Sequence, residues 1–376
     1  MKTSILFQLV FILCFSENSA FSQQIDWIKS YSSDKGSRTS GIIATMDGGI
    51  IISGSEWEKV SEPKEYKYFI AKYNSKGDQL WKKYPDPAIR SGSNILKKGF
   101  DYYNACVYID HNTNKKLPCF MKFNEIGEID TLIFYDETKN YNYNLLELVN
   151  LDNGFIITGT VDANEEITFG HNLHIDFKGH LLNTISIIYD FNYSHHSWTD
   201  IQTIVPLTEN RAIATGTYNY ITYFISKFSV NDTLVSCNTL GSHFKQNIDK
   251  ILIFKDDGYI ICGDTWKLNG FVAEVDSSFN IKSKHSLKLA NIQLVRKNDS
   301  TVFIIGTNYK RNKVNLFIGT FVYQKGIVNE TYLNVPNEFL PFCSSMGSDG
   351  SLFIGGGYKL PNETYSFLSV MKININ

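Results

Sequence analysis

Aromatic residues recur at one place in the repeats of this chain, and rings at such a place could hold a sugar or a peptide by stacking. The place is two or three residues after a glycine that ends a short apolar segment such as "DGGIIISG", Asp47 to Gly54. If these segments are equivalent strands of a ring, the aromatic side chains form a broken crown on one face. The alternative is that each ring packs against the adjoining repeat. The five residues are Trp57, Tyr218, Trp266, Tyr309 and Tyr358.

Histidines offer a second kind of chemistry, because neutral imidazole is a common zinc ligand. His195 and His196 are adjacent, and His171 and His174 are three residues apart in "GHNLHIDFKGH". Adjacent loop histidines usually point apart, and residues i and i+3 of a strand project to opposite faces. No cysteine or carboxylate stands at a recognisable ligand spacing, so we expect no metal site.

Two cysteines are candidates for a disulfide. Cys106 and Cys119 bracket "VYIDHNTNKKLP", and a tight hairpin centred on Asn112 and Thr113 would place them opposite each other on two strands. The alternative is that all the cysteines are small buried apolar residues, since adjacent strands often have poor geometry for a disulfide.

The elements that would position these residues are short strands in repeated groups of four. The clearest group runs from Ser40 to Asp86 and reads "SGIIATM", "IIISG", "YKYFIAKYN" and "QLWKKY". Each segment is rich in β-branched or aromatic residues and is bounded by Gly, Asp, Asn or Ser, which is typical of strands joined by hairpins. One group therefore predicts a four-stranded antiparallel sheet.

Seven such groups can be counted, which predicts an all-β, seven-bladed β-propeller with blades of about 40 to 50 residues. The last group stops at its third strand, "SFLSVMKININ", whereas "IDWIKSY" (Ile25 to Tyr31) is an orphan strand that resembles the fourth-strand sequence "DQLWKKY". Pairing the two ends in one sheet closes the ring and hides its edges. A solenoid, or a count of six or eight blades, is the alternative.

The repeats resemble those of exported Bacteroidetes β-propellers, whose recurring phrase is a "DGGYI(I/V)AG" strand, a "KLD-x-x-G" turn and a Trp-bearing strand. Here the matching residues are Asp47 to Gly49, Gly54, "AKYNSKG" and Trp81. The resemblance covers nearly all of the chain after the N-terminal segment, and it implies the fold and export without an activity. "DTL" at Asp130 to Leu132 and at Asp232 to Leu234 is similar to sites where Bacteroidetes attach O-glycans, which makes Thr131 and Thr233 candidate modification sites.

The N-terminal segment and the composition indicate the compartment. Lys2, an apolar run from Ile5 to Phe15 and small residues before Gln23 are typical of a secretory signal peptide, so we expect residues 1–22 to be removed and residues 23–376 to form one propeller domain. We expect an exported protein, periplasmic or at the cell surface, with no membrane span. The net charge of −2 offers no field for nucleic acid, so we expect none as a partner. We also expect a monomer.

No catalytic residue can be assigned from the sequence, which contains no GxSxG, HExxH or GxxxxGK[ST] motif. The turn "AKYNSKGDQLW" is similar to the quinoprotein propeller repeat at three positions, but Tyr73 and Lys76 replace the Asp and Thr of that repeat, so we expect no quinone and no other cofactor. The prediction is a non-catalytic scaffold that binds a protein or glycan on its aromatic loop face. A propeller-fold glycoside hydrolase or lyase is the alternative, because two carboxylates from different blades would leave no sequence signature.

Overall fold

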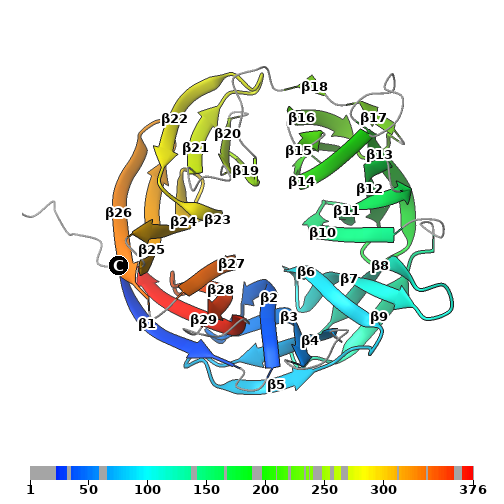
Figure 1. Ribbon diagram of the computed structural model, residues 1–376, viewed down its shortest axis with the longest axis horizontal. Helices are drawn as coiled ribbons and strands as arrows, with labels where there is room; N and C mark the ends of the chain where they lie inside the picture. Colours follow the sequence, from blue (N-terminus) through cyan, green and yellow to red (C-terminus); the bar gives the residue numbers. More distant parts are fainter. Residues whose placement is uncertain are drawn as a thin grey trace, which may run out of the picture.

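The computed structural model of the chain is a ring of seven four-stranded antiparallel blades, as predicted (Figure 1). It describes residues 23–31, 35–58, 66–136, 142–164, 167–188, 197–208, 210–218, 222–232, 234–236, 238–239, 248–254, 258–263, 270–310, 313–335, 338–359 and 366–375. Every regular element in these ranges is a β-strand, and none is a helix that could cross a membrane.

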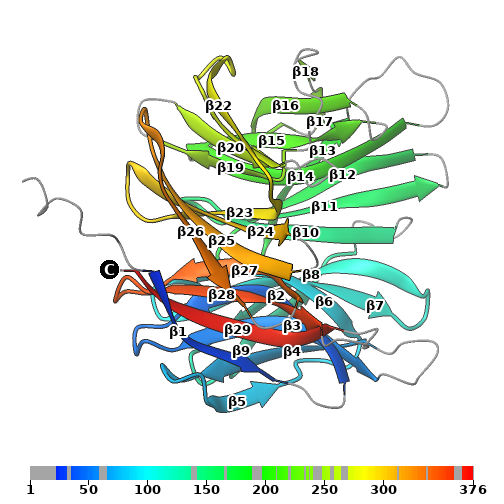
Figure 2. The ribbon, with the colours of Figure 1, turned by 60° about the vertical axis from the view of Figure 1, so that its left-hand side comes forward.

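The blades follow one another along the chain, each running from an inner strand to an outer one (Figures 1 and 2). Blade 1 comprises β2 (Lys35–Ala44), β3 (Ile50–Glu58), β4 (Tyr66–Tyr73) and β5 (Gln79–Lys83). Blade 2 comprises β6 (Ile89–Lys98), β7 (Asp101–Asp110), β8 (Lys115–Phe123) and β9 (Ile129–Phe134). Blade 3 comprises β10 (Asn142–Asn150), β11 (Phe155–Asn164), β12 (Ile167–Ile175) and β13 (Leu181–Ile188). Blade 4 comprises β14 (Ser197–Thr208), β15 (Arg211–Tyr218), β16 (Thr222–Ser229) and β18 (Asn238–Thr239).

The remaining blades complete the ring. Blade 5 comprises β19 (Lys250–Ile253), β20 (Tyr259–Gly263), β21 (Gly270–Val275) and β22 (Ile281–Leu287). Blade 6 comprises β23 (Ala290–Arg296), β24 (Thr301–Lys310), β25 (Lys313–Val322) and β26 (Gly326–Asn334). Blade 7 comprises β27 (Glu338–Met346), β28 (Leu352–Lys359), β29 (Ser366–Ile375) and the N-terminal β1 (Gln23–Ser30).

The seam between blades 3 and 4 departs from the expected pattern. The predicted fourth strand of blade 4 is broken, because β17 (Leu234–Ser236) pairs in parallel with β13 of blade 3. Asn183 on β13 holds the preceding turn there, since its amide donates to the carbonyl oxygens of Val230 and Asp232, at 3.1 Å each. Of the two described pieces of this strand, β18 is the one that pairs with β16, through two residues.

The glycine that ends the repeated phrase has a structural explanation. The inner strand carries a β-bulge opposite this glycine in blades 1, 3, 4, 6 and 7. A Cβ on Gly54 would lie 2.4 Å from the carbonyl oxygen of Arg38, and a Cβ on Gly356 would lie 2.3 Å from that of Leu340. Any side chain there would collide with the backbone before the bulge, so the repeat keeps glycine.

The hydrophobic core lies between the blades. The buried residues within the described ranges form seven clusters, and each of these clusters joins two neighbouring blades. Blades 7 and 1 meet through Phe353 and Val370 on one side and Ile42 on the other. Polar side chains on inner strands add further links: the amide of Asn94 in blade 2 pairs with both the N–H and the carbonyl of Leu148 in blade 3.

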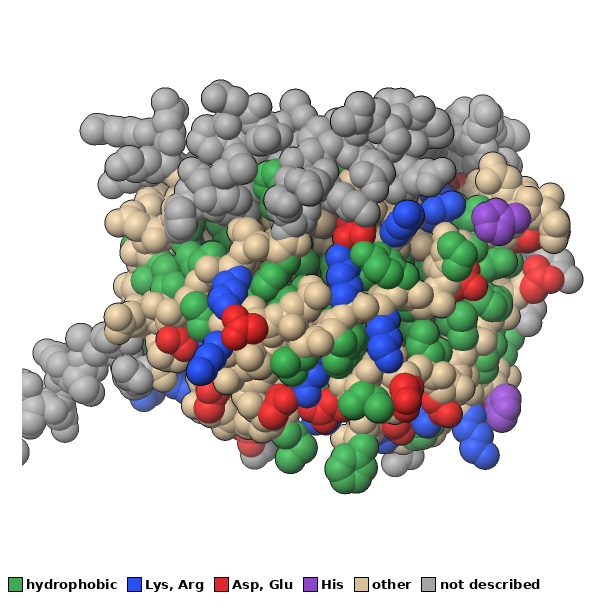
Figure 3. Space-filling model, turned by 90° about the horizontal axis from the view of Figure 1, so that it is seen from below, with side chains coloured by type: hydrophobic (Ala, Val, Ile, Leu, Met, Phe, Trp, Pro, Cys, Tyr) green, Lys and Arg blue, Asp and Glu red, His purple; other side chains and the backbone are tan. Residues whose placement is uncertain are grey.

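One carboxylate joins three blades near the inner strands. Glu147 of β10 accepts hydrogen bonds from the Thr203 hydroxyl (2.7 Å) and from the Ile204 N–H (2.9 Å) of blade 4, and it forms an ion pair with Lys250 of blade 5. The negative charge of Glu147 raises the pKa of Lys250. On the flank seen in Figure 3, acidic and basic side chains are intermingled.

The ring is closed by β1, as predicted. β1 pairs antiparallel with β29 from Gln23 opposite Ile375 to Ser30 opposite Ser369. Trp27 lies opposite Lys372 as Trp81 of β5 lies opposite Lys72. The Trp27 indole N–H donates to the carbonyl oxygen of Ser75 in blade 1, as that of Trp81 donates to Glu125 in blade 2. The orphan strand is therefore the fourth strand of the last blade.

Removing residues 24–31 is expected to destabilise the whole ring. The deletion exposes the ladder edge of β29 and removes the partly buried side chains of Ile25, Trp27 and Ile28 from two seams, which together should lower the free energy of unfolding by about 3 kcal/mol or more. The measurement is the urea unfolding of the truncated and the complete chain. Adding a peptide of residues 23–31 should restore part of the loss, whereas equal midpoints for the two chains would contradict the closure.

Candidate functional site

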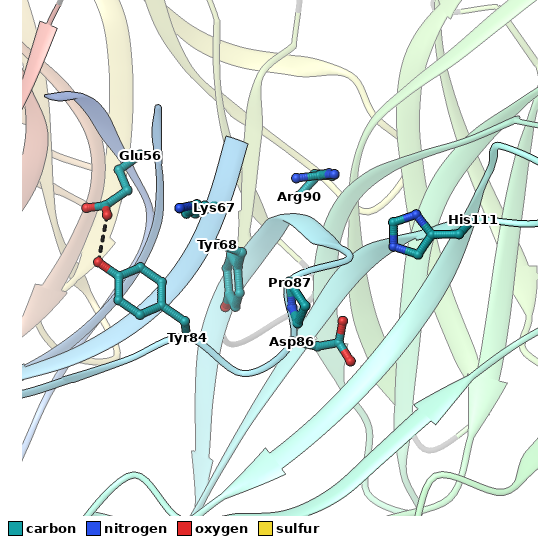
Figure 4. Close-up of a pocket in the computed structure, with 8 residues that line it drawn as sticks. All are labelled: Glu56, Lys67, Tyr68, Tyr84, Asp86, Pro87, Arg90 and His111. Carbon is teal, nitrogen blue, oxygen red and sulfur yellow. Dashed lines mark hydrogen bonds between the residues drawn. The ribbon is translucent and has the colours of Figure 1, made fainter. Parts of the chain in front are cut away.

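A pocket opens between blades 1 and 2, on the face that carries the loops between second and third strands and the links between blades. Its volume is about 520 Å³. The residues that line it come from the end of β3, the start of β4, the link to β6, the start of β6 and the β7–β8 turn: Glu56, Lys67, Tyr68, Tyr84, Asp86, Pro87, Arg90 and His111. In Figure 4, Glu56 and Tyr84 lie at one end of the pocket and His111 lies at the other.

Glu56 is a buried carboxylate whose charge is balanced within the protein. It is 4% exposed, and it forms an ion pair with Lys82 of β5. The Tyr84 hydroxyl donates to its other oxygen at 2.6 Å, the bond drawn in Figure 4. Burial and this carboxylate raise the pKa of Tyr84. The phenol therefore stays neutral, while its ring is half-exposed.

Basic groups form another part of the wall. Lys67 lies opposite Glu56 in the β3–β4 register, and it is exposed. The Arg90 Nη1 donates to the carbonyl oxygen of Tyr66 at 2.8 Å, which orients the guanidinium. The backbone carbonyl of Arg90 in turn accepts from the Ser55 hydroxyl, so the start of blade 2 is fixed to β3 of blade 1.

The wall below these groups is rigid, because Tyr68 is buried and bonded across the seam. Its hydroxyl donates to the Asn104 side-chain oxygen at 2.6 Å. The Asn104 amide donates to the carbonyl oxygens of Ser93 and Asn94, in the bulge of β6. Gly92 leaves room for the aromatic ring of Tyr68, because a Cβ on residue 92 would lie 2.4 Å from that ring.

Two turns hold the remaining lining residues. In the link between blades, the Asp86 Oδ1 accepts from the Ala88 N–H at 2.7 Å, with Pro87 at the bend. His111 begins the β7–β8 turn, where Asp110 accepts from the Asn112 N–H and the Thr113 hydroxyl. Both turns rest on local side-chain to backbone bonds, which keep their shape without a ligand.

Sequence reasoning selected the face but not this pocket. Two other tyrosines on either side of a link between blades, Tyr135 and Tyr143, are buried and packed between blades 2 and 3. The pocket residues come from three separate segments, and their convergence depends on the seam. The one available signal is the exposed tyrosine followed by two prolines in the link "YPDPAIR".

Of the five residues of the predicted aromatic crown, Trp57 is the one whose side chain lies within the described part of the structure. Trp57 is 9% exposed, packs over Gly36 of the neighbouring strand and lies 5.4 Å from the Tyr66 ring between centroids. Tyr218, Tyr309 and Tyr358 lie near the ends of their second strands, as the repeat predicts, and their side chains fall outside the described part, as does all of Trp266. Ligand binding by the crown stays a prediction, with Trp57 in a packing position.

The two cysteines are opposite each other, as the hairpin predicts, but they are not joined. Cys106 pairs with Cys119 in the β7–β8 register, and both are buried free thiols. The Cys106 thiol donates to Asn104 at 3.1 Å, and burial raises the pKa of the Cys119 thiol. Of the candidate modification sites, Thr131 lies half-buried on β9 beside Asp130, and Thr233 lies outside the described residues.

His171 and His174, the pair three residues apart in the sequence, belong to the packing of blade 3. Within the described ranges, no group of three or more His, Cys, Asp or Glu side chains could hold a metal ion. His174 is buried near Asn153, and His171 is buried beside Tyr143 and Phe169, where neither of its ring nitrogens has a described hydrogen-bond partner. His195 and His196 lie outside those ranges.

Comparisons with known proteins support the fold. No family model and no curated protein matches the sequence. Among solved structures, 94% of this chain is similar to 99% of a protein of unknown function from Dyadobacter fermentans, with a TM-score of 0.52 and 8% identity. Similarity to Raptor of Chaetomium thermophilum covers 91% of this chain and 30% of that chain, with a TM-score of 0.54 and 6% identity. These similarities show the β-propeller fold.

Acid is expected to destabilise the fold through His171. Burial lowers its pKa from 6.5 to about 4, so the unfolded chain takes up the proton first as the pH falls. The contribution is fully present above pH 6.5 and is lost between pH 6.5 and 4, which amounts to about 3 kcal/mol. The check is urea unfolding of His171→Leu at pH 7 and pH 4.5: this variant should lose less stability on acidification than the parent, whereas the control His111→Gln should behave as the parent does. Equal losses in His171→Leu and the parent would contradict this role.

Proposed function

We propose that this chain is an exported β-propeller of the Bacteroidetes repeat type that acts at the cell envelope as a non-catalytic binding scaffold, in monomeric form. Its N-terminal residues 1–22 act as the signal peptide, and its ligand is a protein or a glycan bound on the loop face. The observation that carries the proposal is the pocket between blades 1 and 2, which combines a half-exposed ring, oriented donors and fixed turns on that face.

The chemistry of the pocket favours binding over catalysis. A general acid or nucleophile needs a pKa near the working pH or an activating base. The pKa of Tyr84 is raised, and the carboxylate of Glu56 is already engaged by Lys82 and Tyr84. These groups are arranged to donate and accept hydrogen bonds without exchanging protons.

A carbohydrate-active enzyme is the second candidate, because Glu56 and Asp86 line one pocket. Glycosidases commonly act with two carboxyl groups on either side of the scissile bond. Incubating the purified protein with a panel of glycans and analysing the products by mass spectrometry separates the two. Turnover that disappears in Glu56→Gln would establish the enzyme and contradict the scaffold.

The scaffold is tested by replacing the exposed ring. Arrays of glycans and peptides identify bound compounds, and the affinity of each for Tyr84→Ala is then measured by calorimetry. Loss of the stacking face should weaken binding about tenfold. The matched control is Tyr332→Ala, because Tyr332 is 52% exposed where Tyr84 is 49% exposed and lies on the outer strand of blade 6. An equal effect of both substitutions, or no bound compound at all, would contradict this site.

A further inference from the structure

The charged residues that line the pocket differ in whether they form an ion pair. The negative charge of Glu56 is matched by Lys82. Lys67 and Arg90 form no ion pair with any described carboxylate, although both line the same cavity. Among the described lining residues, Asp86 is the one carboxylate left to oppose them. With Lys82 counted beside Glu56, these described groups carry an excess of one positive charge and favour an anionic ligand.

The geometry of Arg90 suits a carboxylate. One of its five N–H donors is held by the Tyr66 carbonyl oxygen, which fixes the guanidinium plane at the mouth of the seam. A planar guanidinium with free donors binds a carboxylate through two parallel hydrogen bonds. Lys67 lies on the adjoining strand end and supplies a second, mobile positive charge.

The other lining groups suit hydroxyls and a ring face. Asp86 keeps one carboxylate oxygen beyond the bond to Ala88, so it can accept from a ligand hydroxyl. The same negative charge repels a doubly charged phosphate group more than a singly charged carboxylate, which favours a carboxylate as the anionic group of the ligand. The exposed surfaces of Tyr84 and Pro87 offer a flat apolar contact of the kind sugars use. A volume of about 520 Å³ is within the range of small-ligand pockets.

We propose that this pocket binds a saccharide that carries a carboxylate, that is, a uronic acid unit. The carboxylate lies against Arg90 and Lys67, the hydroxyls contact Asp86, and the sugar ring lies on Tyr84. This inference rests on the proposed scaffold function and names the ligand class of that same site.

The test compares trigalacturonic acid with its neutral counterpart, galactotriose, by calorimetry on the purified protein in low salt. The acidic trisaccharide should bind at least tenfold more tightly, and added salt should reduce the difference. Lys67→Gln should weaken its binding about tenfold, because a hydrogen bond assisted by charge is lost. The control Lys76→Gln, an exposed lysine in the β4–β5 turn on the opposite face of the same blade, should leave binding unchanged.

Three results would overturn this inference. Equal binding of the two trisaccharides would show a neutral glycan site and leave the scaffold intact. Binding of a peptide with a free C-terminal carboxylate, in a manner dependent on Lys67, without binding of the acidic sugar would show a peptide site. Binding of neither trisaccharide would reject the ligand class, while the array measurements with Tyr84→Ala decide separately whether the scaffold proposal holds.

Discussion

The pairing of β1 with β29 is the interaction on which the rest of the ring depends. Each hydrophobic cluster is shared by two blades, so each blade is stable only where both of its neighbours are in place. β1 supplies Ile25 and Ile28 to the seam between blades 6 and 7 and Trp27 to the seam between blades 7 and 1, where Tyr31, the residue after β1, also packs. Tyr31 also donates to the carbonyl of Gly77 and lies against Tyr73 of blade 1. One short segment from the other end of the chain therefore stabilises two seams. The seam between blades 7 and 1 also helps to position blade 1, which forms one side of the pocket.

The repeated sequence pattern predicted the architecture well because its residues form interactions within a single blade. Asp47 in the first repeat forms an ion pair with Lys72 and accepts from the Gly49 N–H, while Gly54 makes room for a bulge. In blades 1, 2, 3 and 5, the asparagine or aspartate that opens the turn between the third and fourth strands accepts from two backbone N–H groups, and these turns begin at Asn74, Asn124, Asp176 and Asp276. In blade 5, Phe279 takes the left-handed conformation that glycine takes at Gly77, Gly127 and Gly179. Interactions of this kind lie within one blade and recur from blade to blade, so a repeated sequence pattern reveals them.

The candidate site depends on contacts between two blades, and the repeated sequence pattern does not reveal such contacts. Lys67 and Arg90 become neighbours because Tyr68, Gly92 and Asn104 fit together across a seam. The second blade departs from the repeated sequence, with Cys106 where other blades have glycine and a wider bulge at Ser93 and Asn94. The departure from the repeat thus supplies the amide network that supports the pocket wall. The broken outer strand of blade 4 was missed for the same reason, since Asn183 of another blade decides where that turn lies.

Native-state hydrogen exchange tests the closure most directly, because it reports the opening free energy of each strand in the intact protein. If β1 completes the ring, its amides and those of β29 should exchange with the same free energy as the central strands β20 and β21 of blade 5, since all open only when the ring unfolds. Amides of β1 that exchange rapidly while those of β20 and β21 stay protected would show that the strand lies loosely on a ring that is stable without it, which would contradict the account.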